Sequence, residues 1–231
     1  MNLLLLVGTK GKAKGAYHQI VEKVDNISFN KSGLFPEKIL EFNETWTKNM
    51  SPEDRTYFKN LTKGHYPKAV VITCSDSRIP LDLVTGTEPG TLFVHRNVCN
   101  QVSLTDKSSV SVLQYSVNSL NVEDIIIVGH SHCGGIDAVL SGDELEEPIG
   151  EWLKEIKKLY IANRKMIDSL PTHREQNLAL VELNIQRVVN IVNQLDIVKN
   201  ARALGKPIKV YGWVYHLGSA ELHNLNIPSS N

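Results

Sequence analysis

Three residues of different chemistry alternate over a five-residue stretch of the sequence. Cys74, Asp76 and Arg78 supply a thiol, a carboxylate and a guanidinium. In extended backbone, positions i, i+2 and i+4 share one face, so the three side chains can line one pocket. The apolar run 69–73 leads into them and predicts a buried parallel strand. Open α/β sheets place their ligand sites at the carboxyl ends of such strands.

A second apolar run, 124–129, also ends in residues that bind metals. His130 and Cys133 follow it at a spacing that lets both side chains reach one ion, and Gly134 and Gly135 permit a tight turn. Together with Cys74 they form a Cys2His set, which suits zinc and leaves a fourth position open. An open position is typical of a catalytic zinc site.

Each of these residues also has a simpler interpretation. Cys74 can be a small buried hydrophobe, His130 a hydrogen-bonded core histidine, and Asp76 with Arg78 a structural ion pair. The combination of two motifs after two strands favours zinc. We interpret Cys99 as a packed thiol and leave His132 out of the metal set.

Four stretches, in this order along the chain, resemble the β-class carbonic anhydrases. The likeness extends from about Phe35 to about Ile227. The stretches are Cys74-Ser75-Asp76-Ser77-Arg78, Gly86-Thr87-Glu88-Pro89-Gly90, Phe93-Val94-His95-Arg96-Asn97-Val98 and Gly129-His130-Ser131-His132-Cys133-Gly134-Gly135.

The resemblance implies a zinc-dependent lyase that reversibly hydrates CO2 to bicarbonate and a proton through a zinc-bound hydroxide. One Zn²⁺ per subunit would be held by Cys74, His130 and Cys133, with no other cofactor. Asp76, fixed by Arg78, would orient the hydroxide; some members instead close the site by placing this Asp on zinc, and the sequence leaves that open. The family forms homodimers or larger homo-oligomers.

A regulatory bicarbonate site found in some members uses a Trp, an Arg and a Tyr. Arg96 and Tyr215 match two of these positions, but Val71 stands at the Trp position. We therefore expect hyperbolic kinetics without strong bicarbonate inhibition.

The predicted fold class is α/β, with a central, mostly parallel β-sheet flanked by helices. N-terminal helices beginning near Pro36 and Ser51 would extend over a partner subunit. Periodic apolar patterns predict further strands and helices; the strands are 91–94 and 207–215, and the helices are 109–120, 151–169 and one long helix over 176–203. We expect residues 1–34 to be an N-terminal extension and residues 35–231 to form one catalytic domain.

Composition excludes several other classes of protein. Lys+Arg and Asp+Glu are equal at 25 each, so neither nucleic acid nor an anionic membrane is an expected partner. Three cysteines are too few for a disulfide framework, which favours a reducing compartment and a cytoplasmic location. The apolar run 3–7 is too short to span a membrane. The Lys- and Gly-rich stretch 10–15 leaves a mitochondrial leader as the alternative location.

Two other functions compete with this interpretation. A CS2 or carbonyl sulfide hydrolase could use the same metal chemistry on a related linear molecule. A non-enzymatic zinc module needs the metal ligands but neither Asp76 nor Arg78.

Overall fold

The computed structural model describes residues 35–228 and divides the chain into two compact units, Met1–His65 and Tyr66–Asn231. The boundary falls inside the predicted domain 35–231, whose extent stays a prediction. The expected extension 1–34, with its alternative as a leader, lies outside the described residues.

The described part of the first unit consists of two helices, α2 (Phe35–Lys48) and α3 (Pro52–Leu61). Ser51 caps α3 as predicted: its side chain accepts a hydrogen bond from the Asp54 amide at 3.0 Å. The rings of Trp46 and Phe58 meet edge to face, with centroids 5.6 Å apart. None of the residues in either helix is buried. The predicted contact with a partner subunit stays a prediction.

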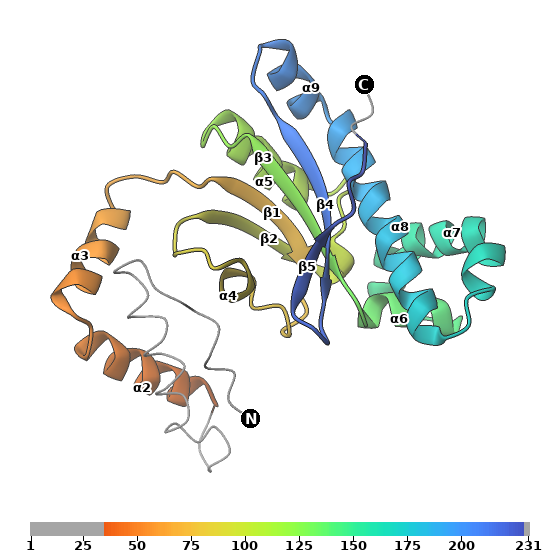
Figure 1. Cartoon of the computed structure of the whole chain (residues 1–231), viewed down its shortest axis with the longest axis horizontal. Helices are drawn as coiled ribbons and strands as arrows, with labels where there is room; N and C mark the ends of the chain where they lie inside the picture. The colour runs from red at the N-terminus through yellow and green to blue at the C-terminus, as the bar shows by residue number, and fades with distance from the viewer. Residues whose placement is uncertain (1–34, 229–231) are drawn as a thin grey trace. The chain divides into compact units, whose positions relative to one another are not determined.

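The second unit is built on a five-stranded sheet in the order β2-β1-β3-β4-β5 (Figure 1). The strands are β1 (Ala69–Cys74), β2 (Leu92–Asn97), β3 (Asp124–His130), β4 (Lys209–His216) and β5 (Glu221–Asn224). The first four in the sheet are parallel, and β5 pairs with β4 in the antiparallel sense. This confirms the central, mostly parallel sheet.

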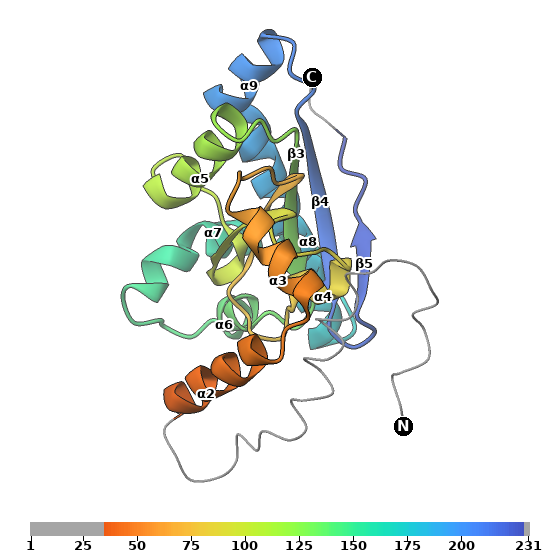
Figure 2. The same ribbon diagram turned by 90° about the vertical axis from the view of Figure 1, so that its left-hand side faces the viewer.

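Helices and one short turn of 3-10 helix connect the strands. They are α4 (Leu81–Thr85), η1 (Val98–Asn100), α5 (Lys107–Asn118), α6 (Gly134–Ser141), α7 (Ile149–Asp168), α8 (His173–Gln194) and α9 (Asp196–Ala203). Figure 2 shows α5, α6 and α7 on one side of β3 and β4. Within residues 35–228, no helix combines the length and the apolar content that crossing a membrane requires.

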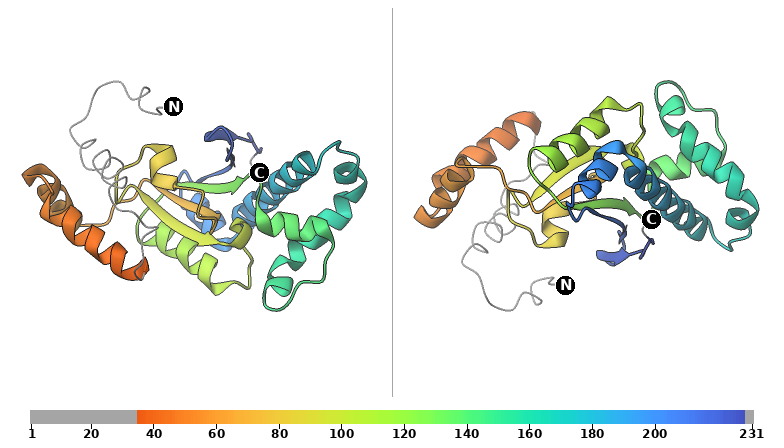
Figure 3. Two further views of the ribbon diagram at one scale, coloured as in Figure 1. Left: turned by 90° about the horizontal axis from the view of Figure 1, so that it is seen from below. Right: turned by 90° about the horizontal axis from the view of Figure 1, so that it is seen from above.

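Two glycines in the central strands allow α8 to pack closely on the sheet. A Cβ at Gly129 would lie 2.8 Å from Ile185 Cδ1, and one at Gly212 would lie 2.7 Å from Ile185 Cγ2. Ile185 is fully buried. Figure 1 shows α8 beside β4, and Figure 3 gives the same helix, in blue, from below and from above. The absence of side chains at these positions thus lets the helix approach β4 and β3, and β3 ends in His130 of the candidate site.

The single long helix expected over 176–203 is wrong, because the chain breaks it into α8 and α9. At the junction Leu195 is extended, with φ −61° and ψ 135°. Val192, Leu195 and Val198 are all buried, so the apolar period continues across the break and conceals it. The other predicted strands and helices are present within a few residues of their expected limits, whereas α4, η1, α6 and β5 had no counterpart among the expected elements.

Candidate metal centre

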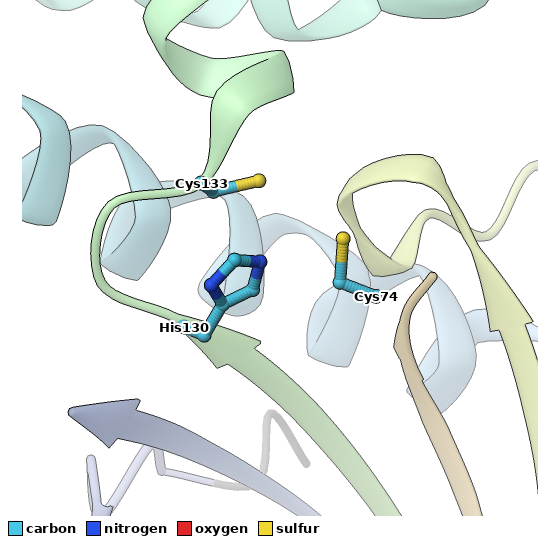
Figure 4. Close-up of side chains that lie close together, drawn as sticks. All are labelled: Cys74, His130 and Cys133. Carbon is cyan, nitrogen blue, oxygen red and sulfur yellow. The ribbon is translucent and has the colours of Figure 1, made fainter. Parts of the chain in front are cut away.

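Cys74, His130 and Cys133 come together at the carboxyl edge of the sheet. Cys74 ends β1, His130 ends β3, and Cys133 directly precedes α6. Their side chains point toward one another (Figure 4), and their ligand atoms all lie within 4.8 Å of one another. All three residues are buried. The adjacent parallel pairing of β1 with β3 places the two strand ends side by side.

The hydrogen bonding of His130 fixes which ring nitrogen is free to bind a metal. Nδ1 lies 3.0 Å from the carbonyl oxygen of Ser131. A carbonyl can only accept, so Nδ1 carries the proton and Nε2 presents a lone pair. Among the described residues, Nε2 is one of a few buried polar side-chain atoms without a hydrogen-bond partner. Burying a polar atom without a partner costs free energy, and a metal ion bound to Nε2 would supply that partner.

The two cysteines require a cation to become thiolates. The hydrogen bond with Cys133 and burial raise the pKa of Cys74 to about 12. The hydrogen bond with Cys74 lowers the pKa of Cys133, but the contact with Cys99 and burial outweigh it and raise the pKa to about 12. A divalent metal supplies the charge that offsets this burial, because a coordinating thiol loses its proton.

The backbone around Cys133 is fixed by α6 and α8. The Cys133 carbonyl accepts a hydrogen bond from the Asp137 amide at 3.0 Å in the first turn of α6. It also accepts one from Asn177 Nδ2 at 3.2 Å, and the same amide group donates to Asp137 Oδ1 at 2.6 Å. Cys133 lies at the N-terminus of α6, where the helix dipole favours a thiolate.

Asp76 and Arg78 form a two-pronged ion pair beside the three ligands. Arg78 Nε donates to Asp76 Oδ1 at 2.9 Å and Arg78 Nη2 to Asp76 Oδ2 at 2.6 Å. These bonds hold the pKa of Asp76 well below its usual range despite the opposing effect of burial. Asp76 Oδ2 lies 3.8 Å from His130 Nε2. An ionised carboxylate oxygen therefore faces the atom expected to bind the metal.

The loop that carries Asp76 is held by Arg96 of β2, a role that the sequence did not reveal. Arg96 Nε donates to the carbonyl of Cys74 at 3.0 Å, and Nη2 donates to the carbonyl of Asp76 at 2.9 Å. Nη1 and Nη2 both lie 3.2 Å from the carbonyl of Ile79. The guanidinium thus joins the start, middle and end of the loop. Motif matching had linked Arg96 to a bicarbonate site, but these donors are used by backbone carbonyls.

Cys99 is packed as expected, yet it lies closer to the centre than its sequence position suggested. It is fully buried in η1, and its Sγ is 3.6 Å from Cys133 Sγ. The sequence could have placed Cys99 near the centre only through its position after β2, because the carboxyl end of β2 is adjacent to that of β1 in the sheet. His132 contributes its carbonyl to Arg78 at 3.0 Å. The metal-binding cluster found among the described residues contains neither Cys99 nor His132.

The donors suit zinc. Two sulfurs and one imidazole nitrogen are typical zinc ligands, and three protein ligands leave room for a fourth. The Asp76 carboxylate beside them, paired with Arg78, is a hydrogen-bond acceptor that is not needed for metal binding alone. The arrangement can therefore bind a metal and orient a small molecule next to it.

Comparison with known proteins gives consistent matches over most of the chain. The family model described as carbonic anhydrase matches residues 69–222. A carbonic anhydrase of Emericella nidulans is 36% identical over 192 residues, which cover 83% of each chain. A tetrameric β-carbonic anhydrase of Sordaria macrospora has a TM-score of 0.78 at 29% identity, covering 82% of this chain and 96% of that one. The Coccomyxa β-carbonic anhydrase in complex with acetazolamide has a TM-score of 0.77 at 31% identity, covering 84% and 87%.

Proposed function

The chain belongs to the β-carbonic anhydrase family, and from that membership we propose that it reversibly hydrates CO2 to bicarbonate and a proton at a zinc site formed by Cys74, His130 and Cys133. The observation that carries the proposal is the convergence of these three ligand atoms within 4.8 Å, next to a carboxylate held by arginine.

Zinc would be bound by the sulfurs of Cys74 and Cys133 and by Nε2 of His130, one ion per subunit. When bound, zinc supplies the Lewis acidity that makes water a usable nucleophile near neutral pH. The protein's own contribution is a set of donors fixed by β1, β3 and α6, together with the Ser131 carbonyl that selects the tautomer of His130.

Asp76 is the residue we assign to orienting the reacting water. Its Oδ2 faces the centre and, because Arg78 keeps the carboxylate ionised, it accepts a hydrogen bond and does not donate one. A water held through one O–H in this way turns a lone pair toward CO2. Arg78 acts as a positioning residue, since it fixes both oxygens of Asp76 and is itself held by the His132 carbonyl.

No observation favours either of the two alternative functions. A CS2 or carbonyl sulfide hydrolase would need an access path selective for those molecules. A non-enzymatic zinc module would have no use for the Asp76–Arg78 pair.

We further propose a homo-oligomer in a cytoplasmic location. The tetrameric state of the Sordaria macrospora relatives supports the oligomer, and light scattering on the purified chain measures its mass. Cell fractionation tests the location.

Stopped-flow CO2 hydration by the zinc-loaded protein and by Asp76→Asn tests the function. The substitution keeps the size of the side chain but removes the charge, and we expect kcat/KM to fall by about 100-fold. Zinc content, measured by elemental analysis, should not change, because Asp76 is not a ligand. A wild-type protein that binds one zinc and hydrates CO2 no faster than buffer would refute the proposed function.

A further inference from the structure

Cys99 contacts both sulfur ligands of the proposed metal site, each through a different group. Its backbone N–H donates to Cys74 Sγ at 3.3 Å. Its own Sγ lies 3.6 Å from Cys133 Sγ. Cys99 is fully buried, so water does not compete for these contacts. Cys99, which follows β2, therefore links Cys74 at the end of β1 to Cys133 just before α6.

The backbone at Cys99 adopts a conformation that aims its amide at Cys74. Its φ is 63°, in the left-handed region that residues with a Cβ seldom adopt, and the following Asn100 also has a positive φ of 47°. Such conformations persist where the surrounding structure holds them in place. The Cys99 carbonyl is held by Asn184 Nδ2, which donates to it at 2.9 Å from α8. The position of the amide is thus set by packing and hydrogen bonding.

The thiol of Cys99 occupies space that Gly135 leaves open. A Cβ at Gly135 would overlap Cys99 Sγ and would lie 3.1 Å from Val98 Cγ1. Gly135 is two residues beyond Cys133, so the same turn presents the ligand and makes room for the third sulfur. This close packing limits the rotation of the Cys99 side chain and keeps its sulfur beside Cys133.

The direction of the sulfur–sulfur hydrogen bond follows from the chemistry of the ligand. A cysteine that binds a metal does so as a thiolate, which has no proton to give. Cys99 must then be the donor to Cys133. In the metal-binding cluster found among the described residues, the ligands are Cys74, His130 and Cys133, and Cys99 is not a member.

We propose that Cys99 is a positioning residue of the metal centre, which donates one hydrogen bond through its amide to Cys74 and one through its thiol to Cys133. This inference rests on the proposed function, because the thiolates exist only when the metal is bound. The two bonds stabilise the thiolates and fix the direction of their lone pairs. Groups that hold metal ligands in this way contribute measurably to metal affinity.

The experiment compares the full chain with Cys99→Ala and Cys99→Ser. The two substitutions have nearly equal volume, but only serine retains a donor. Zinc dissociation constants come from competition with a chromophoric chelator. Cobalt-substituted samples give the sulfur-to-cobalt absorption band, whose intensity reports the number of thiolate ligands and whose energy reports hydrogen bonding to them.

We expect Cys99→Ala to bind zinc about tenfold more weakly, which is the lower end of the range for residues that support a ligand. Its cobalt band should move to longer wavelength at unchanged intensity, because an unbonded thiolate gives up its electrons more easily. Cys99→Ser should remain close to the wild type in both measurements. If Cys99→Ala does not fold, Cys99→Gly, which also tolerates the positive φ, replaces it in the same comparison.

Three results would overturn the proposal. Equal zinc affinity and an unshifted band in Cys99→Ala would show that the thiol donates nothing. Equal weakening in the alanine and serine variants would show that the side chain only fills space. A weaker band in Cys99→Ala would make Cys99 a ligand. Failure of the wild-type chain to bind zinc at all would instead remove the proposed function, and this inference with it.

Discussion

Replacing Arg96 should disable the site without removing its metal. The guanidinium donates to three carbonyls, those of Cys74, Asp76 and Ile79, at 2.9 to 3.2 Å. Arg96→Met keeps the apolar stem of the side chain and removes every donor. The loop would then be held by the Ser75 amide bond to the Asn97 carbonyl and by the bond of Arg78 to the His132 carbonyl, and Asp76 by its contacts with Arg78 and Ile79.

The size of the effect follows from the carbonyls that lose a partner. Partly exposed groups can turn to water, so we take the low end of the range, about 1 kcal/mol for each carbonyl and about 3 kcal/mol in all. At about 1.4 kcal/mol per factor of ten, this corresponds to a fall of about 100-fold in the population of the ordered loop. We expect kcat/KM for CO2 hydration to fall by about 10- to 100-fold. Arg96→Lys should lie between this variant and the wild type, because an ammonium on a shorter stem reaches fewer carbonyls.

Stopped-flow CO2 hydration measures this effect, and elemental analysis measures zinc in the same samples. Arg164→Ala is the control, since Arg164 forms an exposed ion pair with Asp168 in α7 and should leave kcat/KM unchanged. We expect zinc content to stay at one per chain in all variants, because Arg96 contacts the Cys74 carbonyl and not its sulfur. If zinc-loaded Arg96→Met had kcat/KM within twofold of the wild type, the role of Arg96 in holding the loop would be refuted. The same would follow if the variant lost zinc but kept wild-type activity per bound zinc ion.

Three further outcomes follow from the same structure. Gly212→Ala would place a Cβ 2.7 Å from Ile185, so we expect the free energy of unfolding to fall by about 1–3 kcal/mol. The melting temperature should fall by about 2–4 °C for each kcal/mol lost. Gly218→Ala is the unaffected control, because the atom nearest to its new Cβ would be 3.9 Å away. Burial raises the pKa of Glu182, so its ionisation destabilises the fold as pH rises through the carboxyl range. Glu182→Gln should therefore raise the melting temperature at neutral pH and leave it unchanged in acid. Equal effects of the substitution at both pH values would argue against this cause. Because the donors of Arg96 are taken by carbonyls and Val71 replaces the expected Trp, CO2 hydration should follow a hyperbolic rate law, and strong cooperative inhibition by bicarbonate at acidic pH would contradict this.

The sequence predicted the part of the site that depends on short, local residue patterns. Two apolar runs, each followed at once by ligand-type residues, predicted two strand ends carrying Cys74, His130 and Cys133. Parallel strands present their carboxyl ends at the same edge, so convergence required only that the two strands be neighbours. The structure pairs β1 directly with β3 and brings the three side chains together.

The remainder depended on contacts between segments distant in the chain. The roles of Arg96 and Cys99 require β2 to lie on the other side of β1 in one register, with Thr73 opposite Arg96 and Cys74 opposite Asn97. A shift of one residue would turn Arg96 to the other face of the sheet, and nothing in the spacing of its own segment specifies that register. The break at Leu195 was missed for a related reason: periodicity records which side chains are buried and not the backbone angles between them.

All four parallel strands contribute residues that form or hold the candidate metal centre, and this explains why its parts lie so far apart in the sequence. β1 ends in Cys74 and leads into the loop with Asp76, and β2 contains Arg96 and leads into Cys99. β3 ends in His130, whose partner is the Ser131 carbonyl, and Ser131 is held in turn by the Tyr215 carbonyl of β4 through a 2.9 Å bond from its amide. Cys74 is therefore held from β2, and the residue that orients His130 is held from β4, whereas Cys133 is held by α6 and α8. The order β2-β1-β3-β4 fixes the geometry of the centre as firmly as the identity of the ligands does.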